Sequence, residues 1–461
     1  MDFLKRPNGQ SVIEILLAIA LLSLATTSSF TLISSAISEG AFSDYQSQGQ
    51  TLLVSSLEAV RQIRDREWDL LAAGNHGLAI QGAEWIFSGT EDIQDGRFHR
   101  TITVTETSAD EREARIRVSW DRGGRTVSLE STAHLTNWKN LEVWGNWGQP
   151  YIVASLDIGP EGEGTGVSVL GNHVFMTAED THEHRPTFFS INTETITDPF
   201  IESSGPPNED LKGVVTNDEA NIVYTIGVKT GAQLRVFDVS NPASPVQVAT
   251  RSLLANGHMG TLAGSYLYVG AANGMHIFTV SDPGNPIEIG TFSPGVDVRG
   301  ISVSGTIAYL ATPNDNEELM IVDVSNPASP VKVGSANLSG SVDGLSVAAY
   351  KNKLYVGRYN NSSTQPEIYI FDRTAPTAPV LLNSIDNGGP INSMIAAGPY
   401  LFTATNISNR EFTVYDVRDP LNVHIEASLN MSQVAAGLDL VDNTIYISLR
   451  SNDAFQIIRP Q

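Results

Sequence analysis

A nine-residue phrase that occurs twice constrains the fold of this chain more than any other feature. The phrase DVSNPASPV stands at Asp238–Val246 and again at Asp323–Val331, and looser copies begin at Thr279, Asp372 and Asp416. A short apolar stretch precedes each copy, as in LRVF, LMIV and IYIF. Proline fixes its own φ and keeps the preceding residue out of the helical region, so each phrase is predicted to end one strand and start the next.

The spacing of these phrases predicts a seven-bladed β-propeller over residues 150–461. Counting from the residue before each Asp position, and adding degenerate copies at both ends, gives spacings of 41 to 49 residues, and short strands repeating at this period are typical of propeller blades. The markers are Phe189, Phe237, Phe278, Val322, Phe371, Tyr415 and Ile458. QPYIVASLDI from Gln149 matches SPVQVATRSL from Ser244, so we expect the strand near Tyr151 to complete the last blade. The repeats resemble the LVIVD family.

One mouth of the predicted channel is the candidate binding site. Aligning the innermost strands, which begin with glycine as in GVSVLG, places one residue of each blade there: Thr165, Lys212, His258, Arg299, Asp343, Asn392 and Ala436. Some seven residues must lie there in any propeller, so a purely structural interpretation stays open. For a ligand site we select Lys212, His258, Arg299, Asp343 and Asn392. A metal-dependent hydrolase needs more converging carboxylates or histidines, so we expect no enzymatic activity, catalytic residue, metal or cofactor.

The N-terminal stretch has a different character. Lys5 and Arg6 precede Gly9, and residues 12–30 are almost unbrokenly apolar except for Glu14. A helix of this length crosses the ~30 Å hydrocarbon core of a bilayer. Further on, Leu53, Leu57, Val60 and Ile63 recur at helical spacing. These patterns predict one long helix over residues 11–71, ended by Gly74 and Asn75.

The basic leader, Gly9, Glu14 and the apolar run together resemble the prepilin signal of type IV pilins and pseudopilins. The resemblance implies that a prepilin peptidase cuts after Gly9 and that Gln10 becomes the methylated N-terminus. It also implies that Glu14 pairs with the amine of a neighbouring pilin subunit and that residues 12–37 contact the membrane. A secretory signal peptide and a plain membrane anchor remain alternatives.

Between the predicted helix and the propeller, three segments alternate apolar and polar residues as half-buried strands do: Phe98–Glu106, Arg115–Trp120 and Thr126–Leu135. A long helix followed by a small antiparallel sheet resembles the pilin fold. We therefore expect a multidomain chain of leader 1–9, long N-terminal α-helix 10–71, small pilin-like antiparallel β head 72–138 (α+β), linker 139–149 and all-β propeller 150–461. Residues 137–150 hold Trp138, Trp144 and Trp147, which either pack inside the protein or form an exposed aromatic patch.

Charge and cysteine content exclude some functions. The net charge is −23, of which residues after Pro150 contribute −17, and this argues against a nucleic-acid partner. The chain has no cysteine, which excludes disulfides, thiolate metal sites and a cysteine nucleophile.

The resemblances together imply a minor pilin or pseudopilin, in low copy or at a filament tip, that displays the propeller for adhesion or protein binding. The implied location is the cytoplasmic membrane, as a single-pass protein with the propeller outside, and then the pilus at the cell surface. The alternative is a membrane-anchored extracytoplasmic binding or sensor module outside any filament. An adhesive pilus and a type II secretion-like pseudopilus are not distinguished, and the surface ligand or protein partner stays unidentified.

Overall fold

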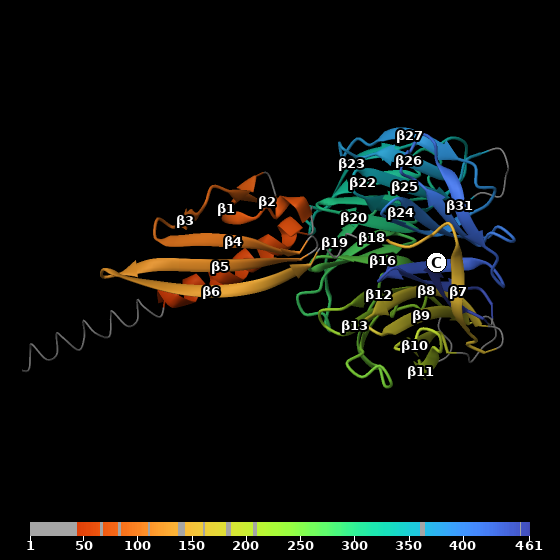
Figure 1. Cartoon of the computed structure of the whole chain (residues 1–461), viewed down its shortest axis with the longest axis horizontal. Coiled ribbons are helices and arrows are strands. Elements are labelled where there is room, and N and C mark those ends of the chain that lie inside the picture. The colour runs from red at the N-terminus through yellow and green to blue at the C-terminus, as the bar shows by residue number, and fades with distance from the viewer. Residues whose placement is uncertain are drawn as a thin grey trace, which may run out of the picture. The chain divides into compact units, whose positions relative to one another are not determined.

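The computed structural model describes residues 44–64, 68–81, 84–108, 111–136, 143–159, 162–180, 186–205, 210–359, 365–451 and 453–461 (Figure 1). The chain forms two compact units. The first, called the head here, contains the described residues up to Val60 together with 71–79 and 85–135, and the second contains the propeller from residue 136 on and two short segments. Strands dominate both units.

The predicted fold class, with its long N-terminal helix and pilin-like α+β head, is wrong. Among the described residues the α-helix covers 44–64, and a short 3-10 helix, η1 (Trp68–Leu70), follows it. Gly74 does not cap a helix but opens strand β1 with a φ of 129°, and Asn75 pairs with Thr103 of the sheet. The apolar residues from Leu53 to Ile63 all lie within the described helix 44–64. Their spacing therefore indicates a helix but not its length. Residues 1–43, with most of the predicted helix, lie outside the described residues.

The head is an antiparallel sheet in the order β2-β1-β4-β5-β6, with β3 also paired to β4. Its strands are β1 (Gly74–Gln81), β2 (Glu84–Ser88), β3 (Asp92–Gln94), β4 (Phe98–Ser108), β5 (Glu111–Arg122) and β6 (Arg125–Thr136). Alternate residues of β5, from Ala114 to Trp120, are fully or almost fully buried, as the two-residue period of a half-buried strand requires. The helix lies close against this face, because a Cβ on Gly49 would come within 2.9 Å of the Trp120 ring.

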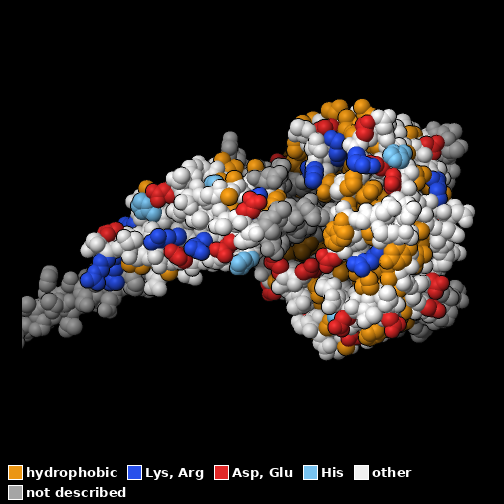
Figure 2. Space-filling model, in the orientation of Figure 1, with side chains coloured by type: hydrophobic (Ala, Val, Ile, Leu, Met, Phe, Trp, Pro, Cys, Tyr) orange, Lys and Arg blue, Asp and Glu red, His pale blue; other side chains and the backbone are white. Residues whose placement is uncertain are grey.

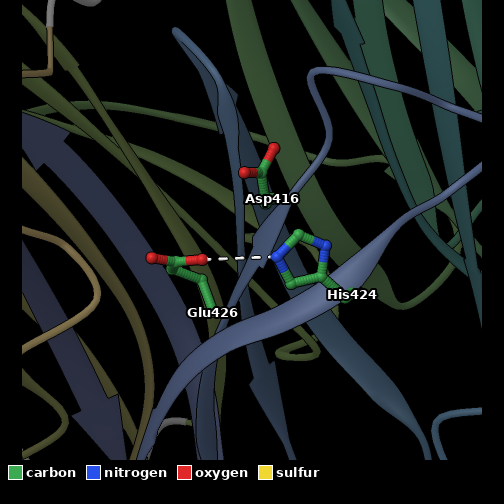
Figure 3. Close-up of side chains that lie close together, drawn as sticks. All are labelled: Asp416, His424 and Glu426. Carbon is green, nitrogen blue, oxygen red and sulfur yellow. Dashed lines mark ion pairs between the residues drawn. The ribbon is translucent and has the colours of Figure 1, made fainter.

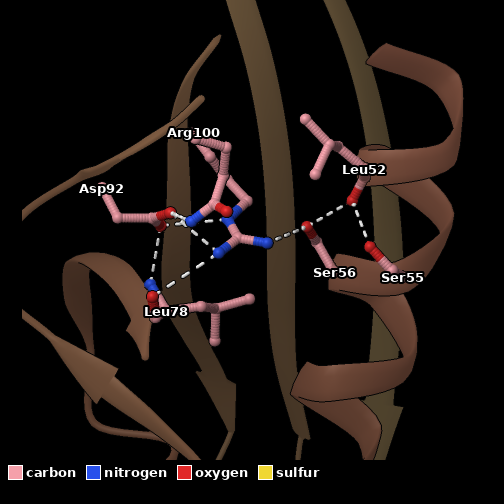
Figure 4. Close-up of polar contacts among 7 residues, drawn as sticks. Leu52, Ser55, Ser56, Leu78, Asp92 and Arg100 are labelled. Carbon is pink, nitrogen blue, oxygen red and sulfur yellow. Dashed lines mark hydrogen bonds and ion pairs between the residues drawn. The ribbon is translucent and has the colours of Figure 1, made fainter. Parts of the chain in front are cut away.

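A buried arginine joins the head sheet to the helix (Figure 4). Arg100 is 2% exposed, and its guanidinium donates to both carboxylate oxygens of Asp92 at 2.9 and 2.8 Å. It also donates to Ser56 Oγ on the helix at 3.2 Å. Burial alone would raise the pKa of Asp92, but the hydrogen bonds from Arg100, Leu78 and Gln94 outweigh it and lower that pKa. A buried charge is tolerated here because it is paired with the Asp92 carboxylate and has further hydrogen bonds.

The propeller consists of seven four-stranded antiparallel sheets in the described part of the chain, which confirms the predicted repeat propeller. Blades 1 to 3 are β8 (Gly162–Leu170), β9 (His173–Asp180), β10 (Phe188–Asn192), β11 (Phe200–Ser204); β12 (Leu211–Asn217), β13 (Ile222–Gly227), β14 (Leu234–Asp238), β15 (Val246–Arg251); and β16 (Gly257–Ala263), β17 (Tyr266–Ala271), β18 (Gly274–Thr279), β19 (Ile287–Phe292). Blades 4 and 5 are β20 (Gly300–Ser304), β21 (Ile307–Ala311), β22 (Leu319–Asp323), β23 (Val331–Ala336); and β24 (Gly344–Tyr350), β25 (Lys353–Arg358), β26 (Ile368–Asp372), β27 (Val380–Ile385). Blades 6 and 7 are β28 (Ile391–Ala397), β29 (Tyr400–Thr405), β30 (Phe412–Asp416), β31 (His424–Leu429); and β32 (Ala435–Val441), β33 (Thr444–Leu449), β34 (Phe455–Pro460) with β7 (Pro150–Leu156).

The last blade closes the ring as the sequence match predicts. Its outer strand is β7, which lies beside the C-terminus in Figure 1. β7 pairs with β34 in the register Phe455↔Leu156 to Pro460↔Pro150. The β-bulge at Ile457/Ile458 repeats the bulge at Val236/Phe237 of blade 2. A strand from near the start of the propeller therefore covers the free edge of its last blade.

The repeated phrase also joins four of the blades to the preceding blade. In four blades the carbonyl of the first proline accepts a hydrogen bond from the preceding blade. The pairs are Ser203 Oγ to Pro242 at 2.8 Å, Tyr224 OH to Pro283 at 3.0 Å, Tyr309 OH to Pro376 at 3.1 Å and Asn383 Nδ2 to Pro420 at 3.0 Å. The phrase is therefore both the turn within a blade and a contact between blades.

The predicted single-pass membrane location is corrected by the structure. None of the helices in the described part of the chain is long and apolar enough to cross a membrane. The prediction rested on residues 12–37, which lie outside the described residues.

Candidate functional site

The innermost strands begin at one mouth of the propeller channel, and six of them have a one-residue register shift at or near this end. The residues skipped by these shifts are Thr165, Lys212, His258, Leu345, Asn392 and Ala436. In blade 4, Arg299 precedes Gly300 at the same ladder position. The structure thus places six of the seven predicted mouth residues at equivalent positions. In blade 5 the equivalent residue is Leu345, and Asp343 lies two residues earlier.

In blades 1, 2, 4 and 7 a glycine directly after this position allows the neighbouring inner strands to approach one another. A Cβ on Gly213 would lie 3.1 Å from the Met259 Cα of the next blade, and one on Gly437 would lie 2.9 Å from the Gly166 Cα. A Cβ on Gly300 would lie 3.0 Å from the Ser346 Cα. A larger residue would crowd the neighbouring backbone at each of these positions, so the recurring glycines reflect the close packing of the inner strands around the channel.

The charged mouth residues are paired with carboxylates. Lys212 forms an ion pair with Glu179, and Arg299 Nη1 lies 2.7 Å from Asp343 Oδ2. Asp297 Oδ2 lies 3.7 Å from both Arg299 Nε and His258 Nε2. Since three carboxylates face two cations here, the mouth does not present a free anion-binding surface.

His258 has a lowered pKa. Burial is the largest cause, and the positive charges of Arg299 and Lys212 add to it, whereas Asp297 opposes it. The imidazole is therefore neutral at pH 7, and Nε2 has no hydrogen-bond partner within the described residues.

Two other predicted site residues connect blades. Thr165 Oγ1 donates to the Leu211 carbonyl at 2.8 Å, and Asn392 Nδ2 donates to the Ala435 carbonyl at 2.6 Å. Each bond reaches the inner strand of the next blade. The structural interpretation left open by the sequence therefore accounts for Thr165 and Asn392.

A row of buried carboxylate and amide groups was not predicted from the sequence. Each precedes the third strand of its blade and accepts a hydrogen bond from a backbone N–H 20 residues later. The pairs are Gln233 with Leu253, Glu318 with Leu338, Glu367 with Asn387 and Glu411 with Met431. Burial raises the pKa of Glu318 and Glu367. The signal in the sequence is the Glu or Gln that begins QLRVFD, ELMIVD, EIYIFD and EFTVYD.

The loop between β15 and β16 exposes an apolar side chain at this face of the propeller. Leu254 is 90% exposed and has a φ of 59°, a left-handed conformation that is unfavourable for leucine. Gly295 and Gly388 stand the same three residues after the outer strands of blades 3 and 5, with φ of 81° and 83°. Gly159 stands at the same position in blade 7 with a φ of 101°, whereas blades 4 and 6 have Ser339 and Ser432 there without a positive φ. Among the described blades that adopt the left-handed conformation at this position, Leu254 therefore stands where the others have glycine.

Residues 1–43 include Gly9, Gln10 and Glu14, so the predicted processing and assembly sites lie outside the described residues. Their roles remain predictions.

Comparisons with known proteins support the propeller. The LVIVD repeat family model matches residues 227–250, 261–293 and 295–337, which lie in blades 2 to 4. A chain in the crystal structure of the mitotic checkpoint complex is similar with a TM-score of 0.52 and 13% identity, covering 68% of this chain and 94% of that chain. The WD40 β-propeller domain of Doa1 has a TM-score of 0.51 and 11% identity, covering 68% of this chain and 97% of that one.

No curated protein matches the sequence. The family match falls within the propeller, so the pilin resemblance of the N-terminal stretch is not supported by it. At these identities the structural likeness shows the fold alone. The chain therefore carries a repeat β-propeller that contains LVIVD repeats.

Proposed function

We propose that this protein binds another protein through the mouth face of its propeller and carries out no reaction of its own. The observation that carries the proposal is that Leu254 is almost fully exposed and has a strained backbone conformation. Strain of this kind costs of order 1–3 kcal/mol and is concentrated at functional sites. Leu254 lies four residues before His258 on the loop that leads into the mouth. The exposed leucine lies near the ion-paired charges of the channel mouth. A partner protein with an apolar pocket could bury this side chain on binding.

The wider surface agrees with a protein partner. Exposed aliphatic side chains recur on the outer strands, and Figure 2 shows hydrophobic groups at the propeller surface beside acidic and basic ones. Among these outer residues are Val246, Ile287, Val331, Val380 and Leu381. They recur in several blades and belong to the repeat, whereas Leu254 differs from it. We therefore assign the specific contact to Leu254.

Leu254→Gly is expected to make the protein more stable while it weakens partner binding. Glycine adopts the left-handed conformation without steric cost, and this gain exceeds the added entropy of the unfolded chain, for a net increase of roughly 0.5 kcal/mol in the free energy of unfolding. Urea unfolding measures it. Leu254→Ala keeps the strain and is the matched control, with no expected increase. A glycine variant less stable than the alanine variant would contradict the strain argument.

The partner itself is identified by photo-crosslinking in the native cells. A photoreactive phenylalanine analogue at Leu254 is expected to form a discrete adduct with one protein. The control position is Asn326, an exposed residue in a turn between the third and fourth strands, at the other end of the blades. Equal labelling at both positions, or none at Leu254, would rule out the proposed binding face.

A second candidate function rests on the sequence alone. Gly9, Gln10 and Glu14 have the spacing of a prepilin signal, so we propose that a prepilin peptidase cuts after Gly9 and that Glu14 joins the protein to pilin-like subunits. The mass and N-terminal residue of the natively purified protein test this. A start at methylated Gln10 is the expected result, and Gly9→Leu is expected to leave the leader attached. A native N-terminus at Met1 would contradict the proposed cleavage after Gly9 and would leave the proposed protein binding at Leu254 unaffected.

A further inference from the structure

The outer part of blade 6 brings three metal-ligating side chains together (Figure 3). Asp416 ends β30, and His424 and Glu426 lie on the neighbouring strand β31. One ligand atom of each residue lies within 4.8 Å of the other two. His424 Nε2 and Glu426 Oε2 are 3.4 Å apart. This is the separation of two donors bonded at about 2.1 Å to one tetrahedral ion.

The other blades provide an internal comparison for His424. Asp416 pairs directly with His424 across the ladder. All six other blades have an apolar residue at that ladder position. These residues are Tyr151, Phe200, Val246, Ile287, Val331 and Val380. An imidazole there is therefore a feature of blade 6 and not of the repeat.

Glu426 departs from the repeat in a similar way. It occupies the bulge of the outer strand, where five other blades have an aliphatic residue. These are Val153, Val248, Ile289, Val333 and Leu382. In blade 1 the bulge residue is Glu202, which already bonds to His173 at 2.8 Å. In blade 6 the bulge carboxylate instead faces the histidine that pairs with Asp416.

The imidazole is oriented for coordination through Nε2. His424 Nδ1 lies 3.5 Å from the Asn422 carbonyl oxygen, which favours a proton on Nδ1. Nε2 then faces the Glu426 carboxylate with its lone pair, and a cation bound between these two atoms would be attracted by both. A ring nitrogen that faces a backbone carbonyl, together with neighbouring carboxylates, is the usual environment of a histidine metal ligand.

Arg418 is the competing cation. Its Nε lies 3.0 and 2.8 Å from the two oxygens of Asp416, and its Nη2 also contacts Oδ2. The Arg418 side chain is 70% exposed, whereas that of Asp416 is 5% exposed. An ion pair with one largely solvated partner is weak, so the arginine can leave while the carboxylate stays in place.

We propose that Asp416, His424 and Glu426 bind a divalent cation of the zinc class, in competition with Arg418. One imidazole nitrogen and two carboxylate oxygens suit Zn²⁺, whereas Ca²⁺ takes six or more oxygen ligands. Three protein ligands leave a fourth tetrahedral position for water or for a donor from a partner. The bound ion replaces the guanidinium as the positive charge beside Asp416.

Calorimetric titration of the full chain with ZnCl₂ tests the site. His424→Ala is expected to weaken zinc binding at least about 10-fold, and Arg418→Ala to tighten it by about 10-fold or more. Circular dichroism of each variant checks that the propeller remains folded. Two matched controls are expected to leave zinc affinity unchanged: His99→Ala, which removes a histidine 3.6 Å from Glu91, and Asp372→Asn, which alters the equivalent Asp of blade 5.

Three results would overturn the proposal. Zinc affinity that is equal in the wild type and in His424→Ala would show that the ion binds elsewhere. The absence of zinc binding in both the wild type and Arg418→Ala would show that the three ligands do not form a site. Calcium binding as tight as zinc binding would show that the ligand class is wrong.

Discussion

Replacing Trp147 by Ala is expected to lower the free energy of unfolding by about 3–5 kcal/mol. The Trp147 side chain is fully buried and packs edge-on against Phe402, with ring centroids 4.7 Å apart. Its Nε1 donates to Asn443 Oδ1 at 3.0 Å. Truncation therefore leaves a cavity beside Phe402 and removes a buried hydrogen bond. Urea unfolding followed by circular dichroism measures the loss.

Trp144 offers a matched control three residues away. Its side chain is 58% exposed, so Trp144→Ala is expected to change stability by less than about 0.5 kcal/mol. The backbone of Trp144 remains bonded to Asn443 in both variants, since its N–H donates to Asn443 Oδ1 and its carbonyl accepts from Asn443 Nδ2. Similar losses for the two tryptophans would contradict the assignment of Trp147 as the buried anchor.

Replacing Asp439 by Asn is expected to stabilise the protein at pH 7.5 and to have little effect at pH 4. Burial raises the pKa of Asp439 to about 6. The negative charge of Asp218 also raises this pKa, whereas the hydrogen bonds from Val169 N–H and Leu440 N–H lower it. Between its unfolded value near pH 4 and this folded value, the folded carboxyl holds a proton that the unfolded chain has lost. Wild-type stability therefore falls as pH rises from about 4 to 6 and stays reduced above it.

A shift of about two pKa units corresponds to at most about 3 kcal/mol. In the wild type, Val169 N–H donates to Asp439 Oδ2 and Leu440 N–H to Oδ1, each at 2.8 Å. Asparagine has one side-chain oxygen and keeps one of these two bonds, so the expected gain in the free energy of unfolding at pH 7.5 is roughly 1–3 kcal/mol. Urea midpoints at pH 4, 5, 6 and 7.5 measure it. Asp453→Asn removes the same charge from an exposed position and is expected to change stability by less than about 0.5 kcal/mol at every pH. A gain for Asp439→Asn that does not grow with pH would refute the linkage.

The propeller was predictable because its information is local and repeated. Each DVSNPASPV phrase predicts one turn, and the carboxylate of its Asp accepts a hydrogen bond from the N–H two residues later, as Asp238 does from Ser240 at 2.9 Å and Asp323 from Ser325 at 2.8 Å. The ring closure followed from the match between the strand near Tyr151 and the outer strand that begins at Val246. Alignment of two sequence segments was sufficient there, because the two strands have the same ladder and the same bulge.

The head and the mouth were harder to predict for two physical reasons. Helical spacing at Leu53, Leu57, Val60 and Ile63 shows which face is buried but not where the helix ends, and strand pairing overrides the weak turn signal at Gly74. The inner strand of blade 5 was placed by its first glycine, Gly344, whereas the register shift puts Leu345 at the mouth position. A shift of one residue in a strand ladder is set by hydrogen bonding between strands, which a single sequence does not record.

The closing strand also determines the order in which the molecule is made. β7 leaves the ribosome before blade 1, but its partner β34 emerges only after the six complete blades, and Trp144 is 299 residues from the asparagine that fixes it. Contacts so distant in sequence form slowly, because the long intervening chain must be ordered first. Throughout synthesis, the edge of β7 is therefore unpaired and open to other nascent chains. We expect early folding to depend on chaperones that cover this strand until translation ends.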